Sequence, residues 1–268
     1  MICKATMTQT AYLLKKKEAV CVFYILFLMV IMNFIGNVLD FQGRDIVEMY
    51  HPMKLLLLSY NRTSWNATNT LLLIQLYPLL VACPAGFSLA REYQRGTRVF
   101  MVSRLGNHTY QASKYLSAFL TTMIVFTVPF LLEIVLNCVS FPLSAAGDLS
   151  NRSIYEGTYM ESPYLHALLG TLLWGIVSGL FGALTVAVSS LIRVKYNVFL
   201  LLPVFVALNL STILAGRLPK GAASIRWYDY VLFFHDKPQS TVLLLTGIFV
   251  LVLFLAGAAC ASGRKDCL

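Results

Sequence analysis

Six apolar segments alternate with polar segments along the 268-residue chain. A helix needs about 20 consecutive apolar residues to cross the hydrocarbon core of a bilayer. The segments that approach or exceed this length lie near residues 19–38, 70–90, 115–138, 164–191, 197–215 and 241–262. This pattern predicts an all-α polytopic membrane protein, with six transmembrane helices in a single transmembrane domain that covers residues 1–268.

Two intervals between these segments carry apolar residues of their own. Residues 39–69 include four consecutive leucines, 55–58, a run too short to span a bilayer. We expect that run to form an interfacial or re-entrant helix. Residues 216–240 combine aromatic residues with scattered charges, which predicts an outer interfacial or re-entrant segment before the sixth span. That segment would act as an aromatic belt or as a cap over an exit pathway.

The charge content supports a membrane protein and indicates its orientation. Hydrophobic residues make up 58% of the chain and charged residues 12%, whereas soluble domains carry about 25% charged residues. No aromatic-basic surface points to nucleic acid, despite the net charge of +9. Thirteen of the 21 basic residues fall at the two termini and in the loops after the second and fourth spans. The positive-inside rule therefore predicts a multi-pass protein of the cell (cytoplasmic) membrane with both termini in the cytoplasm.

The motifs of catalytic and metal sites are absent from the sequence. The six cysteines form no CxxC pair, and the four histidines show no HExxH spacing. No segment reads GxSxG or GxxxxGK[ST], so P-loop binding of a nucleotide by this chain is excluded. We therefore expect no catalytic residue, no metal and no cofactor bound by the chain itself, which predicts that it is not an enzyme.

A basic segment, residues 91–114, separates the second and third spans. Its glycines predict a short helix over residues 97–105, with Thr97 as N-cap and Gly106 as the left-handed stop. The middle of this helix, around Phe100, is apolar on most sides, so one flat surface cannot bury it. Two interpretations follow. The helix lies in the membrane interface, or it packs between the transmembrane bundle and a cytoplasmic protein.

Polar and small residues within the spans suggest two further features. Gly175, Gly179 and Gly182 form a small-residue face for helix packing, either within the chain or against a second chain. Glu133 is the only acidic residue inside a predicted span, near enough to its outer end to reach water at the headgroups. Glu133 would have either a structural role or a role in substrate contact. Polar residues in the outer halves of the spans would line a vestibule with it: Asn137, Gln75, Asn209, Asn33 and Asn37.

Residues 87–114 carry a more specific pattern. Glu92 is followed by Gly96-Thr97, then by Arg104 after the short helix, and by Lys114 at the head of the third span. This order resembles the permeases of the type 2 ABC exporter family, and the six-span plan extends the resemblance over most of the chain. Asn107-His108 departs from the aliphatic residues that many members carry after the helix.

The resemblance implies roles that composition does not. Residues 97–105 would be the coupling helix that contacts a separate P-loop ATPase subunit, and residues 11–14 with the three lysines at 15–17 would form an N-terminal interfacial helix. The coupling loop would comprise Glu92, Gly96, Thr97, Arg98, Phe100, Arg104 and Lys114.

The resemblance also implies partners and cargo. A second permease chain, identical or different, would complete a dimer in membrane lipid, without nucleic acid. ATP and Mg would bind the partner ATPase, and the cargo would be an exported amphipathic or hydrophobic peptide, lipid or drug. The alternative function is an ion-coupled secondary transporter or channel that uses Glu133.

Overall fold

The computed structural model describes residues 2–46, 49–59, 64–142, 162–191, 197–215, 226–228 and 241–264. In these ranges every regular element is a helix, and no strand occurs. The all-α prediction is therefore confirmed for the described part of the chain.

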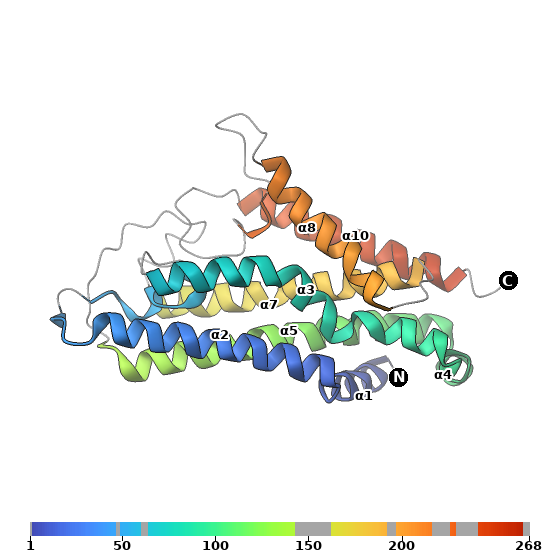
Figure 1. The fold of residues 1–268 in the computed structure, drawn as a ribbon. Coiled ribbons are helices and arrows are strands. Elements are labelled where there is room, and N and C mark those ends of the chain that lie inside the picture. Colours follow the sequence, from blue (N-terminus) through green and yellow to red (C-terminus); the bar gives the residue numbers. More distant parts are fainter. Residues whose placement is uncertain are drawn as a thin grey trace.

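Four long helices form the central bundle: α2 (Lys17–Phe41), α3 (Ser64–Gln94), α5 (Asn107–Ser140) and α7 (Pro163–Leu191). Each contains one of the first four predicted spans and is long and apolar enough to cross a membrane. Helices α2 and α5 run in one direction, and α3 and α7 run in the opposite direction (Figure 1). Between α3, α5 and α7 the core is aromatic, because Tyr77, Phe126, Phe130 and Trp174 are buried together.

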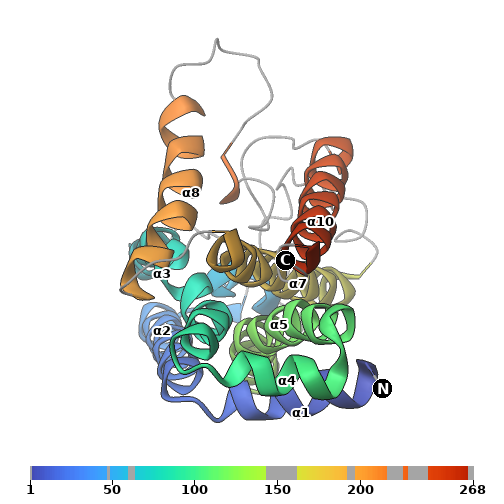
Figure 2. The same ribbon diagram turned by 90° about the vertical axis from the view of Figure 1, so that its right-hand side faces the viewer.

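Two further helices cover one side of this bundle. Helix α8 (Leu201–Ala215) follows the 3₁₀ turn η4 (Asn197–Leu200) and packs against α3, and α10 (Thr241–Arg264) packs against α7 (Figure 2). Turn η4 and α8 together cover the fifth predicted span, and α10 contains the sixth. Their apolar stretches, Leu201–Leu214 and Leu244–Ala258, are shorter than those of the other four helices. Among the described residues, four helices are thus both long and apolar enough to cross a membrane, and the complete six-span topology remains a prediction.

Helices α1 (Ile2–Leu14) and α4 (Thr97–Leu105) lie together at one end of the bundle, which we call the α4 end (Figures 1 and 2). Helix α1 starts well before the predicted residues 11–14. It buries Thr6, Thr10 and Leu13 and packs against α5. The predicted N-terminal helix is therefore present and longer than expected, and its position in a membrane interface remains a prediction.

The opposite end of the bundle encloses a stretch without α-helix. Residues 51–59, called the buried segment, contain two short 3₁₀ helices, η2 (Pro52–Lys54) and η3 (Leu57–Ser59). All nine residues of the buried segment are buried. The prediction of a helix at the four leucines is thus wrong in type, because two 3₁₀ turns replace it. Its interfacial or re-entrant position in a membrane remains a prediction.

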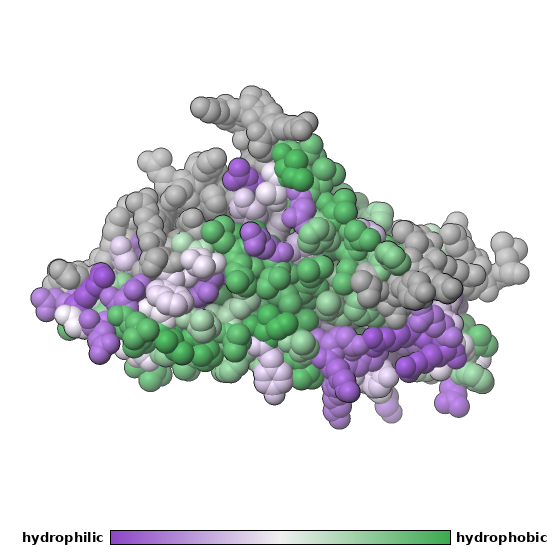
Figure 3. All heavy atoms as spheres, in the orientation of Figure 1, coloured by the Kyte–Doolittle hydropathy of each residue, from purple (hydrophilic) through white to green (hydrophobic). Residues whose placement is uncertain are grey.

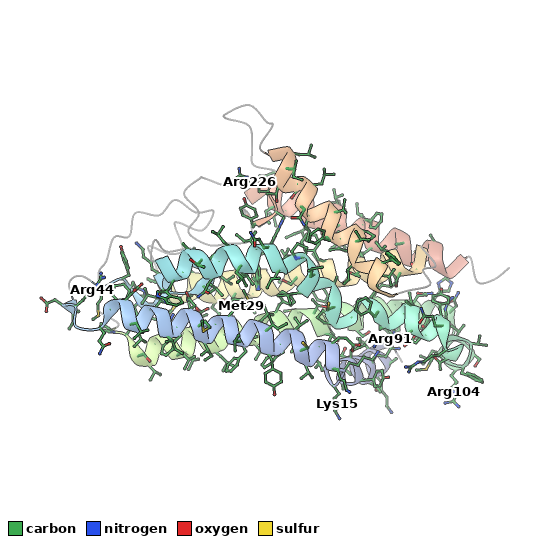
Figure 4. The ribbon with its side chains drawn as sticks, viewed as in Figure 1. Lys15, Met29, Arg44, Arg91, Arg104 and Arg226 are labelled. Atoms are coloured by element: carbon green, nitrogen blue, oxygen red, sulfur yellow. The ribbon has the colours of Figure 1, made fainter. Side chains whose placement is uncertain are left out.

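Hydrophilic residues gather at the two ends of the molecule, and an apolar band lies between them (Figure 3). The stick view places Lys15, Arg91 and Arg104 at the α4 end, Arg44 at the opposite end and Met29 between them (Figure 4). An apolar band flanked by polar ends matches a membrane with water on both sides. These features indicate a multi-pass membrane protein.

Candidate functional site

Helix α4 has the bounds that the sequence predicted, residues 97–105. Glycines flank it on both sides, Gly96 with φ 69° and Gly106 with φ 77°. Residues with a Cβ rarely adopt positive φ, so glycine permits a sharp turn at each end. The N-cap residue is Gly96, and the prediction that Thr97 caps the helix is wrong because Thr97 already lies inside the first turn. Helix α5 begins directly after Gly106, at Asn107, earlier than the predicted third span.

One face of α4 presents apolar side chains to the outside. Val99 and Phe100 are each 71% exposed, and Met101 is 40% exposed. Arg104 is also exposed, whereas Val102 and Leu105 pack against the core cluster beneath the helix. Exposed apolar residues beside a cation on a short helix are typical of a surface that lipid or another protein covers.

A carboxylate at the end of α3 bonds to the first turns of α5. Glu92 Oε1 accepts a hydrogen bond from Lys114 Nζ, and Glu92 Oε2 accepts one from Tyr110 Oη. The Lys114 side chain is only 3% exposed, so its charge depends on Glu92 for compensation. Glu92 and Lys114 belong to the pattern that carries the family resemblance. The fold brings them together although 22 positions separate them.

Arg98 has a different position from the one expected of a coupling-loop residue. It is 7% exposed, and its guanidinium lies over the Tyr93 ring at 4.3 Å and near the Tyr110 ring at 6.0 Å. A guanidinium stacked on aromatic rings anchors the helix by cation–π attraction. Arg98 therefore holds α4 against the bundle, and of the two helix arginines only Arg104 belongs to the exposed surface.

A second ion pair at the same end was not predicted. Arg91 on α3 pairs with Glu18 in the first turn of α2. The sequence did offer a signal, because Glu18 is the only acidic residue among residues 1–38 and follows three lysines. Burial, and after it the charges of Lys114 and Arg91, lower the pKa of the Lys16 ammonium. The α4 end is thus crowded with positive charge, which Glu18 and Glu92 partly neutralise.

The opposite end of the bundle holds a buried polar cluster around Glu133. Glu133 Oε1 accepts hydrogen bonds from Asn33 Nδ2 and from the backbone N–H of Leu57, both at 2.8 Å. The Glu133 side chain is 1% exposed, so the expectation that it reaches headgroup water is wrong. The reason is that the buried segment lies over it and separates it from the surface.

The other members of the cluster bond to the backbone of the buried segment. Asn37 Nδ2 donates to Leu55 O at 2.7 Å, and Asn137 Nδ2 donates to Pro52 O at 3.4 Å. Two side chains of α3 also donate to this backbone. Asn66 Nδ2 donates to Leu56 O at 3.2 Å, and Thr70 Oγ1 donates to Leu57 O at 3.0 Å. Backbone groups outside a regular helix need such partners when they are buried. The polar cluster is defined as Asn33, Asn37, Asn66, Thr70, Glu133 and Asn137.

Two residues of the predicted vestibule lie elsewhere. Gln75 is exposed on α3, and Asn209 Nδ2 donates to Phe205 O within its own helix α8 at 2.8 Å. A vestibule lined by all the predicted polar residues therefore remains a prediction. Asn33, Asn37, Glu133 and Asn137 come together, and Gln75 and Asn209 remain apart from them.

The glycine face of α7 packs inside the chain. A Cβ added at Gly175 or Gly182 would collide with Thr127 or Thr122 of α5, and one at Gly179 would lie 2.8 Å from the Phe119 backbone oxygen. Close approach of two helix backbones is the usual role of such small residues in membranes. Of the two partners predicted for this face, the structure places α5 against it.

One residue of the predicted aromatic segment reaches the core. The Trp227 ring stacks on the Tyr77 ring, with centroids 4.2 Å apart and an interplanar angle of 17°. Residues 226–228 are the described part of the interval 216–240, and the rest of that prediction lies outside the described residues. Trp227 thus joins the aromatic core of the four-helix bundle.

Metal-type clusters and disulfides are absent from the described part of the chain. No group of three or more His, Cys, Asp or Glu residues lies close enough there to hold a metal ion, and the five described cysteines are unbridged. Comparison with known proteins gives no assignment either, since no family model, curated protein or solved structure matches the chain.

Proposed function

We propose that the chain is the transmembrane permease subunit of an ATP-driven ABC exporter, powered by a separate ATPase subunit. The observation that carries the proposal is the exposed apolar face of α4, with Val99 and Phe100 each 71% exposed at the end of the bundle richest in basic residues. The helix follows the pattern of Glu92, Gly96-Thr97 and Lys114 that resembles type 2 ABC exporters. Such a surface suits a groove on a cytoplasmic protein, because a groove can cover several sides of a short helix.

The connections of α4 suit it to transmit movement. Short links join α4 to α3 on one side and to α5 on the other, and Glu92 and Lys114 tie these two long helices to each other. Arg98 anchors α4 by stacking, and the Arg91–Glu18 pair extends the connection to α2. A displacement of α4 would therefore move three helices of the bundle together. In the proposed mechanism, ATP binding closes the partner ATPases, and α4 carries that closure to the membrane helices.

The proposed cargo is amphipathic or hydrophobic. Exposed apolar side chains line one side of α2, among them Tyr24, Leu28 and Met32, and others cover α8 and α10. These surfaces would face lipid, a second permease chain or a greasy pathway between two chains. A peptide, a lipid or a hydrophobic drug would suit such a pathway, and the two chains would be identical or different.

The test is to purify the tagged full-length chain from its own host in mild detergent. The proposal predicts a co-purifying P-loop ATPase in stoichiometric amount, identified by mass spectrometry, and ATP hydrolysis by the purified complex. Phe100→Asp should abolish ATPase association and hydrolysis, because it places a charge in the proposed contact. The matched control is Met7→Asp, which adds the same charge to a 62% exposed apolar residue of α1.

Two results would overturn the proposal. One is a chain that purifies without an ATPase yet transports in vesicles driven only by an ion gradient. The other is an ATPase that remains bound to Phe100→Asp as tightly as to the unmodified chain and to Met7→Asp.

The polar cluster motivates the second candidate function, an ion-coupled transporter that uses Glu133. A carboxyl group that is 1% exposed inside a membrane bundle is the observation in its favour. This function predicts that Glu133→Gln abolishes transport while changes on α4 are tolerated. The exporter function predicts the reverse ranking, so one transport assay on Glu133→Gln and Phe100→Asp separates the two.

A further inference from the structure

The polar cluster leaves three oxygen atoms without a hydrogen-bond partner in the described part of the chain. They are Glu133 Oε2, Asn37 Oδ1 and Asn137 Oδ1. The three side chains are at most 1% exposed. Buried polar atoms normally have hydrogen-bond partners. Three acceptors without one in a single cluster therefore indicate a bound partner such as an ion or a water molecule.

The orientation of the two amide groups follows from their partners. Asn37 Nδ2 faces Leu55 O, and Asn137 Nδ2 faces Pro52 O. A carbonyl oxygen only accepts hydrogen bonds, so each amide must present its nitrogen there and keep its oxygen for another contact. The amide N–H donors of the cluster thus bond to the backbone of the buried segment, and the amide oxygens remain available as acceptors.

Helix geometry places these oxygens near one another. Helices α2 and α5 pack together and run in the same direction (Figure 1). Asn33 and Glu133 form one rung between them at 2.8 Å. Residues four positions later lie one turn further along the same face, so Asn37 and Asn137 form the next rung. The carboxylate and the two amide oxygens therefore lie within about one helical turn, 5.4 Å along the axes.

The carboxylate lacks a positive partner in the described part of the chain, where no ion pair includes Glu133. Buried titratable residues on the elements around it include Lys54 and His51 in the buried segment and His166 on α7. Within the described residues, however, the carboxylate accepts hydrogen bonds only from Asn33 and Leu57. A buried negative charge without compensation is costly. Glu133 must therefore carry a proton or pair with a cation.

We propose that the polar cluster binds one monovalent hard cation such as Na⁺, held by Glu133, Asn37 and Asn137. Carboxylate and amide oxygens are the ligands that such cations prefer. The Pro52 and Leu55 carbonyl oxygens already accept two hydrogen bonds each, so the ligands from the protein are the three side-chain oxygens. A single carboxylate favours a monovalent ion, because the occupied site is then neutral. The cation would join α2 and α5 to the buried segment. The site is independent of the ATPase contact at α4, so it stands or falls separately from the proposed function.

The test measures the unfolding temperature of the purified full-length chain in detergent, with NaCl, KCl, CaCl₂ or choline chloride at equal ionic strength. Na⁺ should raise the unfolding temperature over choline by about 3 °C or more for each tenfold excess over its dissociation constant. Glu133→Gln should abolish this shift and still fold, because the Gln oxygen accepts the same bonds from Asn33 and Leu57. Binding of ²²Na⁺ should show one site per chain in the unmodified protein and none in Glu133→Gln.

The matched control is Asp40→Asn, which removes a carboxylate from the same end of α2 outside the cluster. This variant should keep the full Na⁺ response. Equal unfolding temperatures in Na⁺ and choline, with no ²²Na⁺ bound, would overturn the proposal and leave Glu133 protonated. Stabilisation by Ca²⁺ alone would overturn the monovalent assignment. An Na⁺ shift that persists in Glu133→Gln would show that the ion binds elsewhere.

Discussion

Lys114 Nζ donates to Glu92 Oε1 at a point where the lysine side chain is only 3% exposed. Removing the anion alone leaves a nearly buried ammonium without compensation. Glu92→Gln should therefore lower the free energy of unfolding by about 3 kcal/mol. The double variant Glu92→Gln/Lys114→Met removes both charges and should recover most of that loss. Unfolding in mixed detergent micelles measures both changes.

The Arg91–Glu18 pair at the same end is the control for this ion-pair prediction. Its side chains are 32% and 28% exposed, so water already screens both charges. Glu18→Gln should cost less than about 1 kcal/mol. Equal losses in Glu92→Gln and Glu18→Gln would mean that burial of Lys114 does not determine the strength of its pair.

Arg98 and Arg104 lie on one short helix and should respond to substitution in opposite ways. Arg98 is buried against the rings of Tyr93 and Tyr110, so Arg98→Ala should lower the free energy of unfolding by about 1–2 kcal/mol. Arg104 is exposed, so Arg104→Ala should leave stability unchanged and weaken ATPase association if the proposed function holds. Thermal unfolding and co-purification on the same samples measure the two effects. A stability loss in Arg104→Ala as large as in Arg98→Ala would contradict this assignment.

Gly179 should tolerate no larger side chain. A Cβ there would lie 2.8 Å from the Phe119 backbone oxygen, and a backbone atom cannot rotate away. Gly179→Ala should therefore destabilise the chain by about 1–3 kcal/mol through separation of α5 and α7. Gly247→Ala on α10 is the control, since nothing lies within 4 Å of an added Cβ there. Equal unfolding temperatures for the two variants would contradict the prediction.

Local signals explain which parts of the fold the sequence could predict. Gly96 and Gly106 determine the bounds of α4 by their backbone freedom alone, so the sequence located both ends. The N-cap assignment failed because Gly96 adopts φ 69° and takes the capping position that Thr97 was expected to fill. The full length of α1 was missed for another local reason. Its buried side includes Thr6 and Thr10, so no apolar stripe marks it as a helix.

The polar cluster depends on tertiary structure and was only partly predictable. An acidic residue inside a span suggested a site at Glu133, and the asparagines of α2 suggested polar surroundings. Hydropathy does not reveal that residues 51–59 fold back as 3₁₀ turns and require side-chain partners from three helices. Asn66 and Thr70 were missed for that reason, because their partners Leu56 O and Leu57 O are backbone atoms of a distant segment.

The last prediction concerns the pH dependence of the buried segment. His51 Nδ1 accepts a hydrogen bond from the Met53 N–H at 3.2 Å and so caps η2. Burial, and after it the Lys54 charge, lower the pKa of His51 below its ordinary value of about 6.5. The unfolded chain therefore binds this proton more readily than the folded chain, and stability falls as the pH drops through 6.5.

In His51→Asn the amide oxygen can accept the same bond and does not titrate. The unfolding temperature of the unmodified chain should thus fall more than that of His51→Asn between about pH 7.5 and about pH 5. Parallel curves for the two proteins would contradict a role for His51, because every other titrating group is common to both.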